Sequence, residues 1–439
     1  MVAPRGVFSG ILLAAVSQFA LHNASAAVGD AVIKWNDNAG TAAIKACMNA
    51  DSNSDPFHES RIYAMMHIAI HDALNAIDRK YQPYAYDKKA APGTSPDAAI
   101  AAAAHDVLDK GIAELPTYIF KADCINAGRA SVEAAYKIAI DAIPDAPAKQ
   151  QGIALGREAA AGIMGKRAGD HSDGQYINKD CPKPEPGKYQ CTPGTPFVAF
   201  EAWEKVTPFT LKDAAQFRPG PTYAITDAKF TDDVNEVKRL GGDGKTSPSA
   251  RTDDQTQIAW FWFENSPLKW SRIARTVAVA KGLNQWENAR LFALLNMALA
   301  DGYIAMASAK NHYNFWRPVT AIHYGGDKSW TPLSPTPPDQ DYPSGHSIEG
   351  GVGAGVLRGV LGTDQISFKD CGTTLPAGSR CDDQAAAMRT YTSFTQAADE
   401  NAYSRVLIGF HFRNSTKEGT AYGIQIGEQA AATLLPPVH

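Results

Sequence analysis

Three short motifs between Lys310 and His411 carry residue types that hold and attack a tetrahedral oxyanion. The first motif contains Lys310 and Arg317, the second is the run Pro343–His346, and the third contains Arg405 and His411. An ammonium group and two planar guanidinium groups suit an anion with several oxygens, because each oxygen accepts charge-assisted hydrogen bonds. The sequence therefore predicts an oxyanion site in this part of the chain.

The second motif adds backbone donors and an acid–base group. Ser344, Gly345 and His346 precede Ser347 to Leu361, a Gly-, Ala- and Val-rich stretch that predicts a helix. Free N–H groups and the positive end of the helix dipole attract an anion at such a start, and Gly345 allows close approach of the backbone. His346 is then placed to act as a general acid or base. Taken alone, these residues would equally form a simple capping turn.

The first and third motifs need elements that bring separated residues together. Lys310 and Arg317 are seven residues apart, which predicts one face of one helix, and Pro318 predicts the end of that helix or a kink. Arg405 and His411 are six apart and do not share a helical face, so we expect a long Arg reach or a distortion at the glycine between them. In isolation, such cations are usually solvated, and a histidine among apolar residues is usually a satisfied core residue.

Most of the remaining chain shows the apolar periodicity of helices. Predicted helical stretches are Pro56–Ile77, Ala98–Leu115, Ala127–Ile143, Lys149–Arg167, a stretch that starts at Asp253, Ser266–Lys281 and Asn284–Ala309. His67 and His71 lie four residues apart in the first of these, but two histidines without a third ligand favour packing and hydrogen bonding in a helical core over metal binding. Strand patterns are scarce, so the predicted fold class is all-α.

The stretch Ala168–Ser249 differs from its surroundings, because it is rich in Gly, Pro and Asp and predicts an ordered loop. A loop of this length is either a wall of a functional site or a disulfide-pinned surface excursion, and the sequence leaves both interpretations open. The aromatic run Trp260–Phe263 indicates core packing. No GxSxG occurs in the chain, which excludes a serine-hydrolase nucleophile elbow.

Composition describes an ordinary soluble chain of 439 residues, with 44% hydrophobic and 20% charged residues. A net charge of -4 argues against a general nucleic-acid binder. Arg5, the short apolar run Val7–Val16 and the small-residue site Ala24–Ala26 predict a signal peptide over residues 1–26. No later stretch reads as a membrane span. We therefore expect a secreted or periplasmic protein without stable membrane insertion.

Six cysteines in an exported chain predict disulfides. Two pairs are each ten residues apart, and local pairing is the simplest of the fifteen connectivities. The expected pairs are Cys181–Cys191, Cys371–Cys381 and Cys47–Cys124. None of the six has CxxC spacing, so we do not expect a structural zinc site.

Together the motifs Lys-x6-Arg-Pro, Pro-Ser-Gly-His and Ser-Arg-x5-His resemble the shared signature of vanadium-dependent haloperoxidases and of the type 2 phosphatidic acid phosphatase (PAP2) superfamily. A looser resemblance to bacterial haloperoxidase-like proteins includes Arg61–Asp72 and Pro208–Pro219. The resemblance implies helical bundles with long irregular loops in one domain, residues 27–439. Its N-terminal helical half would be 27–250 and its active-site half 251–439.

As a haloperoxidase, the chain would use vanadate as its cofactor. The resemblance implies that His411 binds vanadium and that His346 is the acid–base catalyst when hydrogen peroxide binds. The residues implied to hold the vanadate oxygens are Lys310, Arg317, Ser344, Gly345 and Arg405. Substrates would be hydrogen peroxide, a halide and an organic acceptor; the sequence does not define an oligomeric state.

As a PAP2-type acid phosphatase, the same cage would hold phosphate. His411 would form a phosphohistidine, His346 would protonate the leaving alkoxide, and the cations would stabilise the transition state of a phosphomonoester. The three motifs do not distinguish these two reactions. A non-catalytic oxyanion binder is a third class, but binding alone needs the cations and not two histidines.

Residues next to the motifs favour a haloperoxidase over a phosphatase. Phe315 and Trp316 before the Arg-Pro pair look like the haloperoxidase form of the first motif. Fungal chloroperoxidases, however, carry Trp and Phe at the positions of Ala307 and Asp339, where they shape the halide pocket. This departure favours bromide or iodide over chloride, and a carboxylate facing the pocket would repel halide.

The third motif shows a further departure. Superfamily members often carry Asp four residues after the final histidine, where it can fix the tautomer of that ring. Here the position is Ser415. Ser415 itself, Asp399 or Glu400 are the candidates to take over this task.

Overall fold

The computed structural model describes residues 29–49, 54–374 and 388–438, so the expected signal peptide lies outside the described residues. The described chain contains thirteen α-helices and two short antiparallel strand pairs, which confirms the all-α prediction. The helices are α1 (Ala31–Lys45), α2 (Pro56–Ile77), α3 (Pro96–Ala113), α4 (Ala122–Asp141), α5 (Pro147–Lys166), α6 (Ala228–Leu240), α7 (Asp253–Phe261), α8 (Ser266–Lys281), α9 (Gln285–Tyr313), α10 (Pro318–Tyr324), α11 (Gly345–Leu361), α12 (Phe394–Leu407) and α13 (Arg413–Thr433). The remaining elements are β1 (Ile177–Asn178) paired with β2 (Val198–Ala199), the 3-10 helix η1 (Glu201–Lys205), and β3 (Phe368–Cys371) paired with β4 (Met388–Tyr391).

Predicted and observed helices agree closely for α2 and α8, whose bounds match, and within a few residues for α3, α4, α5 and α9. Five helices, α1, α6, α10, α12 and α13, are not among the predicted stretches. α6 lies inside the stretch expected to be loop, so that expectation is wrong there. Asp227 caps its first turn, and Phe230, Val237 and Leu240 bury one face of an otherwise polar helix. The helix was not predicted because most of its residues are polar and its apolar stripe is narrow.

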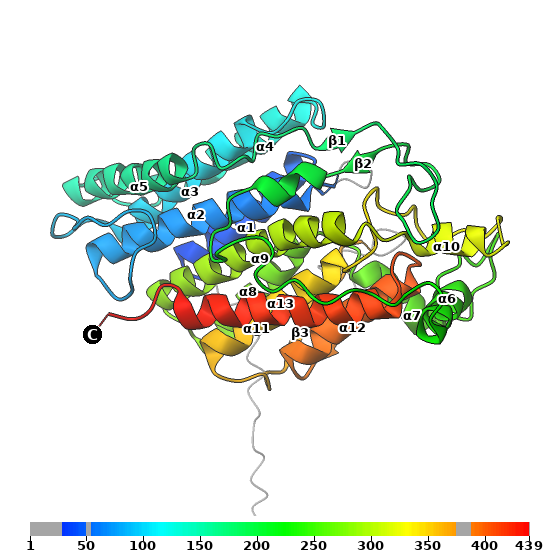
Figure 1. Ribbon diagram of the computed structural model, residues 1–439. Coiled ribbons are helices and arrows are strands. Elements are labelled where there is room, and N and C mark those ends of the chain that lie inside the picture. Colours follow the sequence, from blue (N-terminus) through cyan, green and yellow to red (C-terminus); the bar gives the residue numbers. More distant parts are fainter. Residues whose placement is uncertain (1–28, 50–53, 375–387, 439) are drawn as a thin grey trace, which may run out of the picture.

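Helix α9 runs through the middle of the fold, with α2 on one side and α11 and α13 on the other (Figure 1). Asn284 and Glu287 form a capping box at its start, and every residue from Leu291 to Lys310 is buried. Among the described helices, it alone has the length and apolarity to cross a membrane, but its apolar window is wholly buried, as in a core helix. Its C-terminal end delivers Lys310 to one end of the bundle.

Helices α11 and α13 pack against each other at very short range. Gly423 of α13 lies so close to α11 that an added β-carbon would clash with the carbonyl oxygen of Ile348. Only glycine leaves this space, so the contact sets a short interhelical distance. It fixes the second motif, at the start of α11, against the third motif, just before α13.

A separate apolar cluster ties the three motifs together. Phe315 and Trp316 lie within the first motif, Tyr342 precedes the second and Phe412 follows the third; all four pack in one cluster with Phe230 of α6. The ring centroids of Phe230 and Phe412 lie 5.2 Å apart, and those of Phe315 and Phe412 5.9 Å. Each buried aromatic side chain contributes roughly 1.5–3 kcal/mol, so the cluster is a substantial support for the site.

The described disulfides are Cys47–Cys124, with Cα atoms 5.6 Å apart, and Cys181–Cys191, with Cα atoms 5.5 Å apart. Both are predicted pairs and are confirmed. The third predicted pair includes Cys381, which lies outside the described residues.

His67 and His71 are fully buried in α2. His67 Nε2 accepts from the Asn36 amide at 2.9 Å, and His71 Nδ1 lies 3.0 Å from Asp72 Oδ1. Burial and the charge of Arg275 lower the pKa of His67 to about 3. Both rings thus take part in the helical core, the role favoured by the sequence.

Candidate active site

The first motif spans a break between two helices. α9 ends at Tyr313, Asn314 adopts a left-handed conformation with φ 47°, and Arg317 is the N-cap of α10. The prediction that Lys310 and Arg317 share one helix is therefore wrong. An asparagine tolerates the left-handed region and ends the helix, so the two cations meet by a turn of the chain and not by helical spacing.

Both cations contact the carboxylate of Asp339. Lys310 Nζ lies 2.9 Å from Asp339 Oδ2, and Arg317 Nη2 lies 2.5 Å from Asp339 Oδ1. Burial lowers the pKa of Lys310 to about 8, although Asp339 opposes this shift. Burial would raise the pKa of Asp339, but the charges of Lys310 and Arg317 outweigh it and hold that pKa below its ordinary value. The charged carboxylate of Asp339 therefore pairs with two of the three predicted oxyanion-binding cations, Lys310 and Arg317.

The second motif starts α11, as predicted. Ser344 is the N-cap, its hydroxyl accepts from Ser347 Oγ at 2.9 Å, and its N–H donates to the Ser415 carbonyl oxygen at 3.1 Å. Gly345 is packed so tightly that an added β-carbon would collide with Met306 Sδ. This tight packing against Met306 requires a glycine, while close approach of its N–H to an anion stays a prediction.

His346 is held from the loop that follows α7. Its Nε2 lies 3.2 Å from the carbonyl oxygen of Glu264. A carbonyl only accepts, so Nε2 carries the proton and Nδ1 is the basic nitrogen. Burial, and next the charge of Arg405, lower the pKa of His346 well below its ordinary value. The ring is therefore neutral at neutral pH, with Nδ1 unprotonated.

The third motif leaves its helix before His411. α12 ends at Leu407, and Gly409 has φ 86°, a backbone conformation that favours glycine. An added β-carbon at Gly409 would also collide with Gly241. The distortion expected at this glycine is present, and it turns His411 toward Arg317, whose Nη1 donates to His411 Nε2 at 2.9 Å.

The other nitrogen of His411 faces a residue that the sequence does not single out. His411 Nδ1 lies 3.0 Å from Asp341 Oδ1 and 3.5 Å from Ser415 Oγ. Glu400 binds the Trp262 indole instead, and Asp399 is exposed, so neither of these candidates contacts the ring. The signal that could have pointed to Asp341 is the missing Asp after His411, which calls for another carboxylate nearby.

Arg405 is buried and 1% exposed, yet it forms no ion pair with a carboxylate in the described parts of the chain. Its guanidinium donates to Ser404 Oγ at 3.0 Å and to the Trp262 carbonyl oxygen at 3.0 Å. Burial, and next the charge of Arg317, lower its pKa to about 9. A buried cation without an anion is costly, which makes this position a strong anchor for an anionic ligand.

Five of the seven predicted residues, Lys310, Arg317, His346, Arg405 and His411, lie close enough to influence one another. Burial lowers the pKa of His411 well below its ordinary value, and the charges of Arg317, Lys310 and Arg405, in that order, lower it further. The Ser344 N–H donates to the carbonyl oxygen of Ser415, which is four residues after His411. This bond places the start of α11, with Ser344 and Gly345, beside the same centre. The structure thus gathers the three cations and the two histidines, with Ser344 and Gly345 at the adjoining start of α11; that these residues hold an oxyanion stays a prediction.

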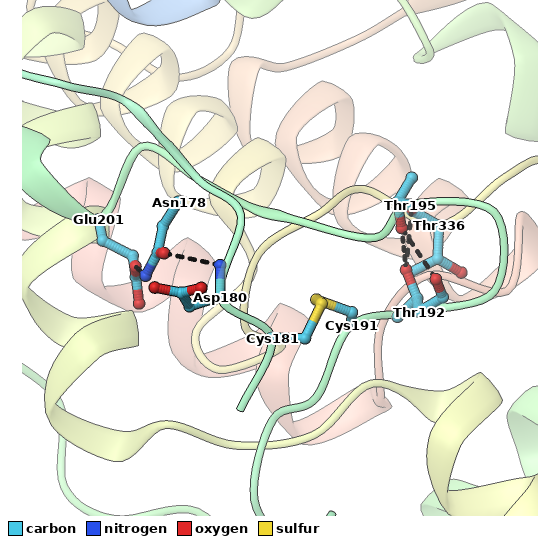
Figure 2. The surroundings of a disulfide bond; sticks show 8 residues. All are labelled: Asn178, Asp180, Cys181, Cys191, Thr192, Thr195, Glu201 and Thr336. Atoms are coloured by element: carbon cyan, nitrogen blue, oxygen red, sulfur yellow. Dashed lines mark hydrogen bonds between the residues drawn. A yellow bond between two sulfur atoms is a disulfide. The ribbon is translucent and has the colours of Figure 1, made fainter. Parts of the chain in front are cut away.

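The long loop between α5 and α6 forms one side of this centre. Tyr189 N–H donates to the Asn314 carbonyl oxygen at 2.9 Å, and Ala199 N–H donates to the Pro338 carbonyl oxygen at 2.7 Å. Figure 2 shows the Cys181–Cys191 disulfide that holds this segment. Of the two interpretations left open by the sequence, the contacts support a wall of the site.

The fold and the centre define a helical protein in which three cations and two histidines are buried at one centre. Residues 290–438 match the family model of the VCPO second helical-bundle domain. The vanadium chloroperoxidase of Curvularia inaequalis is 26% identical over 244 residues, which covers 42% of this chain and only 40% of that enzyme.

Solved structures extend the likeness over the whole fold. A bacterial vanadium-dependent iodoperoxidase aligns with a TM-score of 0.75 and 24% identity, covering 93% of this chain and 97% of its own. An apo-type bacterial vanadium-dependent chloroperoxidase aligns with a TM-score of 0.69 and 15% identity, covering 88% and 95%. The resemblance to vanadium-dependent haloperoxidases seen in the motifs is confirmed by the family model over residues 290–438 and by the shared fold of these solved structures.

Proposed function

We propose that this protein is a vanadate-dependent haloperoxidase that uses hydrogen peroxide to oxidise a halide. The observation that carries the proposal is the buried, uncompensated charge of Arg405 beside Lys310, Arg317 and two neutral histidines. A tetrahedral oxyanion supplies the missing negative charge. The donor set also fits vanadate, since guanidinium, ammonium, hydroxyl and helix-start N–H groups all donate to oxygen.

In this assignment Lys310, Arg317 and Arg405 neutralise the oxyanion, helped by Ser344 Oγ and the Gly345 N–H. His411 Nε2, the nitrogen that faces Arg317, is the nitrogen available to the central atom. When bound, vanadate supplies Lewis-acid activation of peroxide. The residue that handles the proton is His346, whose Nδ1 is free to accept while Nε2 is fixed on Glu264.

Bromide or iodide is the proposed halide. Asp339 stands where a chloride-oxidising relative would carry an apolar ring, and its side chain is 20% exposed at the cage. A carboxylate there repels every halide. Bromide and iodide are easier to oxidise than chloride, so their oxidation stays within reach of such a site. One of the similar structures is named an iodoperoxidase, which supports the same choice.

The proposed setting is outside the cytoplasm. The two described disulfides suit an oxidising compartment, in agreement with the leader expected at residues 1–26. The proposed partners are small molecules: hydrogen peroxide, a halide and an organic acceptor.

A paired assay tests the function. The mature protein receives orthovanadate, peroxide and either iodide, bromide or chloride with a halogenation reporter, and separately a chromogenic phosphomonoester without vanadate. We expect halogenation with iodide or bromide. Turnover of the ester alone, inhibited by vanadate, would replace the peroxidase by the PAP2-type phosphatase, since His411 is equally placed to attack phosphorus.

Two variants connect the activity to the site. His411→Ala should abolish turnover, whereas His312→Ala should retain it, because His312 is exposed and lies outside the cage. Turnover that survives in His411→Ala would place the reaction elsewhere. Vanadate binding without turnover in either assay would support a non-catalytic oxyanion binder.

A further inference from the structure

The two ring nitrogens of His411 have different, complementary partners. Nε2 lies 2.9 Å from Arg317 Nη1, which is farther from Nδ1, at 3.4 Å, and Nδ1 lies 3.0 Å from Asp341 Oδ1. A guanidinium can only donate, so Nε2 must be the acceptor. Because Nε2 accepts, it bears no proton, so the proton of the imidazole is on Nδ1 and is donated to Asp341. The lone pair of the ring is thereby kept on the nitrogen that faces the cation cage.

Asp341 is rigidly held for this task. Its side chain is fully buried, its N–H donates to the Phe315 carbonyl oxygen at 2.9 Å, and its own carbonyl oxygen accepts from Ser415 Oγ at 2.9 Å. These bonds join Asp341 to the first motif on one side and to α13 on the other. Within the described residues, Asp341 Oδ2 has no hydrogen-bond partner, so the carboxylate is not engaged by a competing cation.

Ser415 is the alternative, because it occupies the position where superfamily members often carry Asp. Its hydroxyl lies 3.5 Å from His411 Nδ1, at the limit of a hydrogen bond, and its proton is committed to the Asp341 carbonyl oxygen. Asp341 is closer to the ring and offers a carboxylate. Ser415 therefore supports the backbone of Asp341 while Asp341 contacts the ring.

We propose that Asp341 is the positioning residue of the site, a carboxylate moved from the position after His411 to the segment before the second motif. It fixes His411 in the Nδ1–H tautomer and aims Nε2 at the oxyanion. Only the expected effect of Asp341 on turnover rests on the proposed function. The orientation of the ring and the affinity for an oxyanion follow in the same way for a peroxidase, a phosphatase or a binding protein.

The test separates tautomer, affinity and turnover. Nitrogen-15 spectra of histidine-labelled protein, recorded without vanadate, report which nitrogen of His411 is protonated, and calorimetry with orthovanadate alone reports affinity. Three variants are compared with the parent: Asp341→Ala, Ser415→Ala, and the double variant Asp341→Ala/Ser415→Asp. The double variant returns a carboxylate to within reach of Nδ1 from the other side, because Ser415 Oγ already lies 3.5 Å away.

We expect Asp341→Ala to lose the pure Nδ1–H signal and to weaken vanadate binding by about 10–100-fold. Ser415→Ala should keep the tautomer with a smaller loss, and the double variant should recover most of the affinity. An unchanged tautomer in Asp341→Ala, or a larger loss in Ser415→Ala, would overturn the proposal. If Asp341→Ala does not fold, Asp341→Asn keeps the shape and must still weaken binding.

Outcomes for the proposed function stay distinguishable. Absence of halide oxidation in the parent protein would remove the peroxidase assignment but leave the tautomer and affinity results intact. Normal turnover in the parent with no effect of Asp341→Ala on ring or affinity would leave the function standing and reject the role of Asp341.

Discussion

Asp339 Oδ2 lies 2.9 Å from Lys310 Nζ, so the cage contains a carboxylate of its own. The second oxygen of Asp339 binds Arg317, and the low pKa of the acid keeps it charged. An incoming oxyanion needs the same two cations. The protein's own anion therefore competes with its ligand, and it lowers the net positive charge that the ligand meets.

Asp339→Asn is expected to raise affinity for vanadate by about tenfold or more, since it removes one charge from the ligand's position without a change of shape. Calorimetry with orthovanadate measures the effect. Asp327→Asn is the matched control, because it removes a carboxylate from an exposed pair with Lys238. Weaker binding in Asp339→Asn would mean that Asp339 chiefly holds Lys310 in position.

The charge of Lys310 makes oxyanion binding depend on pH. Burial, its largest cause, lowers the pKa of Lys310 to about 8, so the free site loses this charge as pH rises above 8. Sulfate is a suitable probe because its own charge is constant over this range. Its affinity should fall as pH rises through about 7, where Asp341 with its raised pKa gains a negative charge, and again above 8, where Lys310 loses its charge, by up to about tenfold per pH unit for each group. In Lys310→Arg the second fall should move to higher pH; an unchanged second fall would assign it to another group, with Arg405 the next candidate.

The part of the site carried by local patterns was predictable from the sequence. A Pro-Ser-Gly-His run before a small-residue helix predicts backbone donors at a helix start, and α11 begins at Gly345. The glycine between Arg405 and His411 likewise predicts the distortion found at Gly409, with φ 86°. Both are properties of a few adjacent residues, which is why sequence patterns capture them.

Contacts between distant segments were not predictable in the same way. Asp341 and His411 are separated by 70 residues, and their pairing depends on how the extended segment before α11 lies along α13. The break at Asn314 was missed because helical spacing from Lys310 to Arg317 is equally consistent with a continuous helix. Such a choice is made by tertiary packing, here the burial of Phe315 and Trp316 in the aromatic cluster.

The Cys181–Cys191 disulfide is expected to stabilise the wall of the site more than the fold. The bridge is two residues from Tyr189, whose N–H bonds to Asn314, and Thr192 beside it bonds to Thr195 at 2.6 Å (Figure 2). A short closed loop lowers the entropy of a local segment. Replacing both cysteines by Ser should therefore increase amide hydrogen exchange at Tyr189 and Trp316 and lower oxyanion affinity several-fold, with little change for α9.

The control for this experiment is the double Ser variant of Cys47 and Cys124, which removes the bridge between α1 and α4. That variant should lower the unfolding temperature and leave exchange at Tyr189 unchanged. Protection of the Tyr189 amide that persists without Cys181–Cys191 would show that the wall is held by its contacts with the first motif alone.

The raised pKa of Glu59, a buried residue outside the active site, predicts that the folded protein loses stability as pH rises toward neutrality. Its side chain is buried in α2, where Asn265 Nδ2 donates to Oε2 at 2.9 Å, and burial, the largest cause, raises its pKa from 4.5 to about 7. Between these two values the folded protein keeps a proton that the unfolded chain releases, so the free energy of unfolding falls as pH rises. The contribution is fully present below pH 4.5 and is lost as pH rises through 7.

Glu59→Gln keeps the size of the side chain and its acceptor oxygen but cannot ionise. At pH 8 it should therefore be more stable than the parent by on the order of 1–3 kcal/mol, with the difference disappearing near pH 4.5. Urea unfolding at pH 4.5, 6 and 8 measures this, with the exposed Glu114→Gln as the control for loss of one carboxylate. Other buried acids titrate in parent and variant alike, so only the difference between the two curves counts. If the two curves run parallel, Glu59 is ionised in the folded protein despite its burial, and its hydrogen bonds with Asn265 and Asn49 outweigh the cost of desolvation.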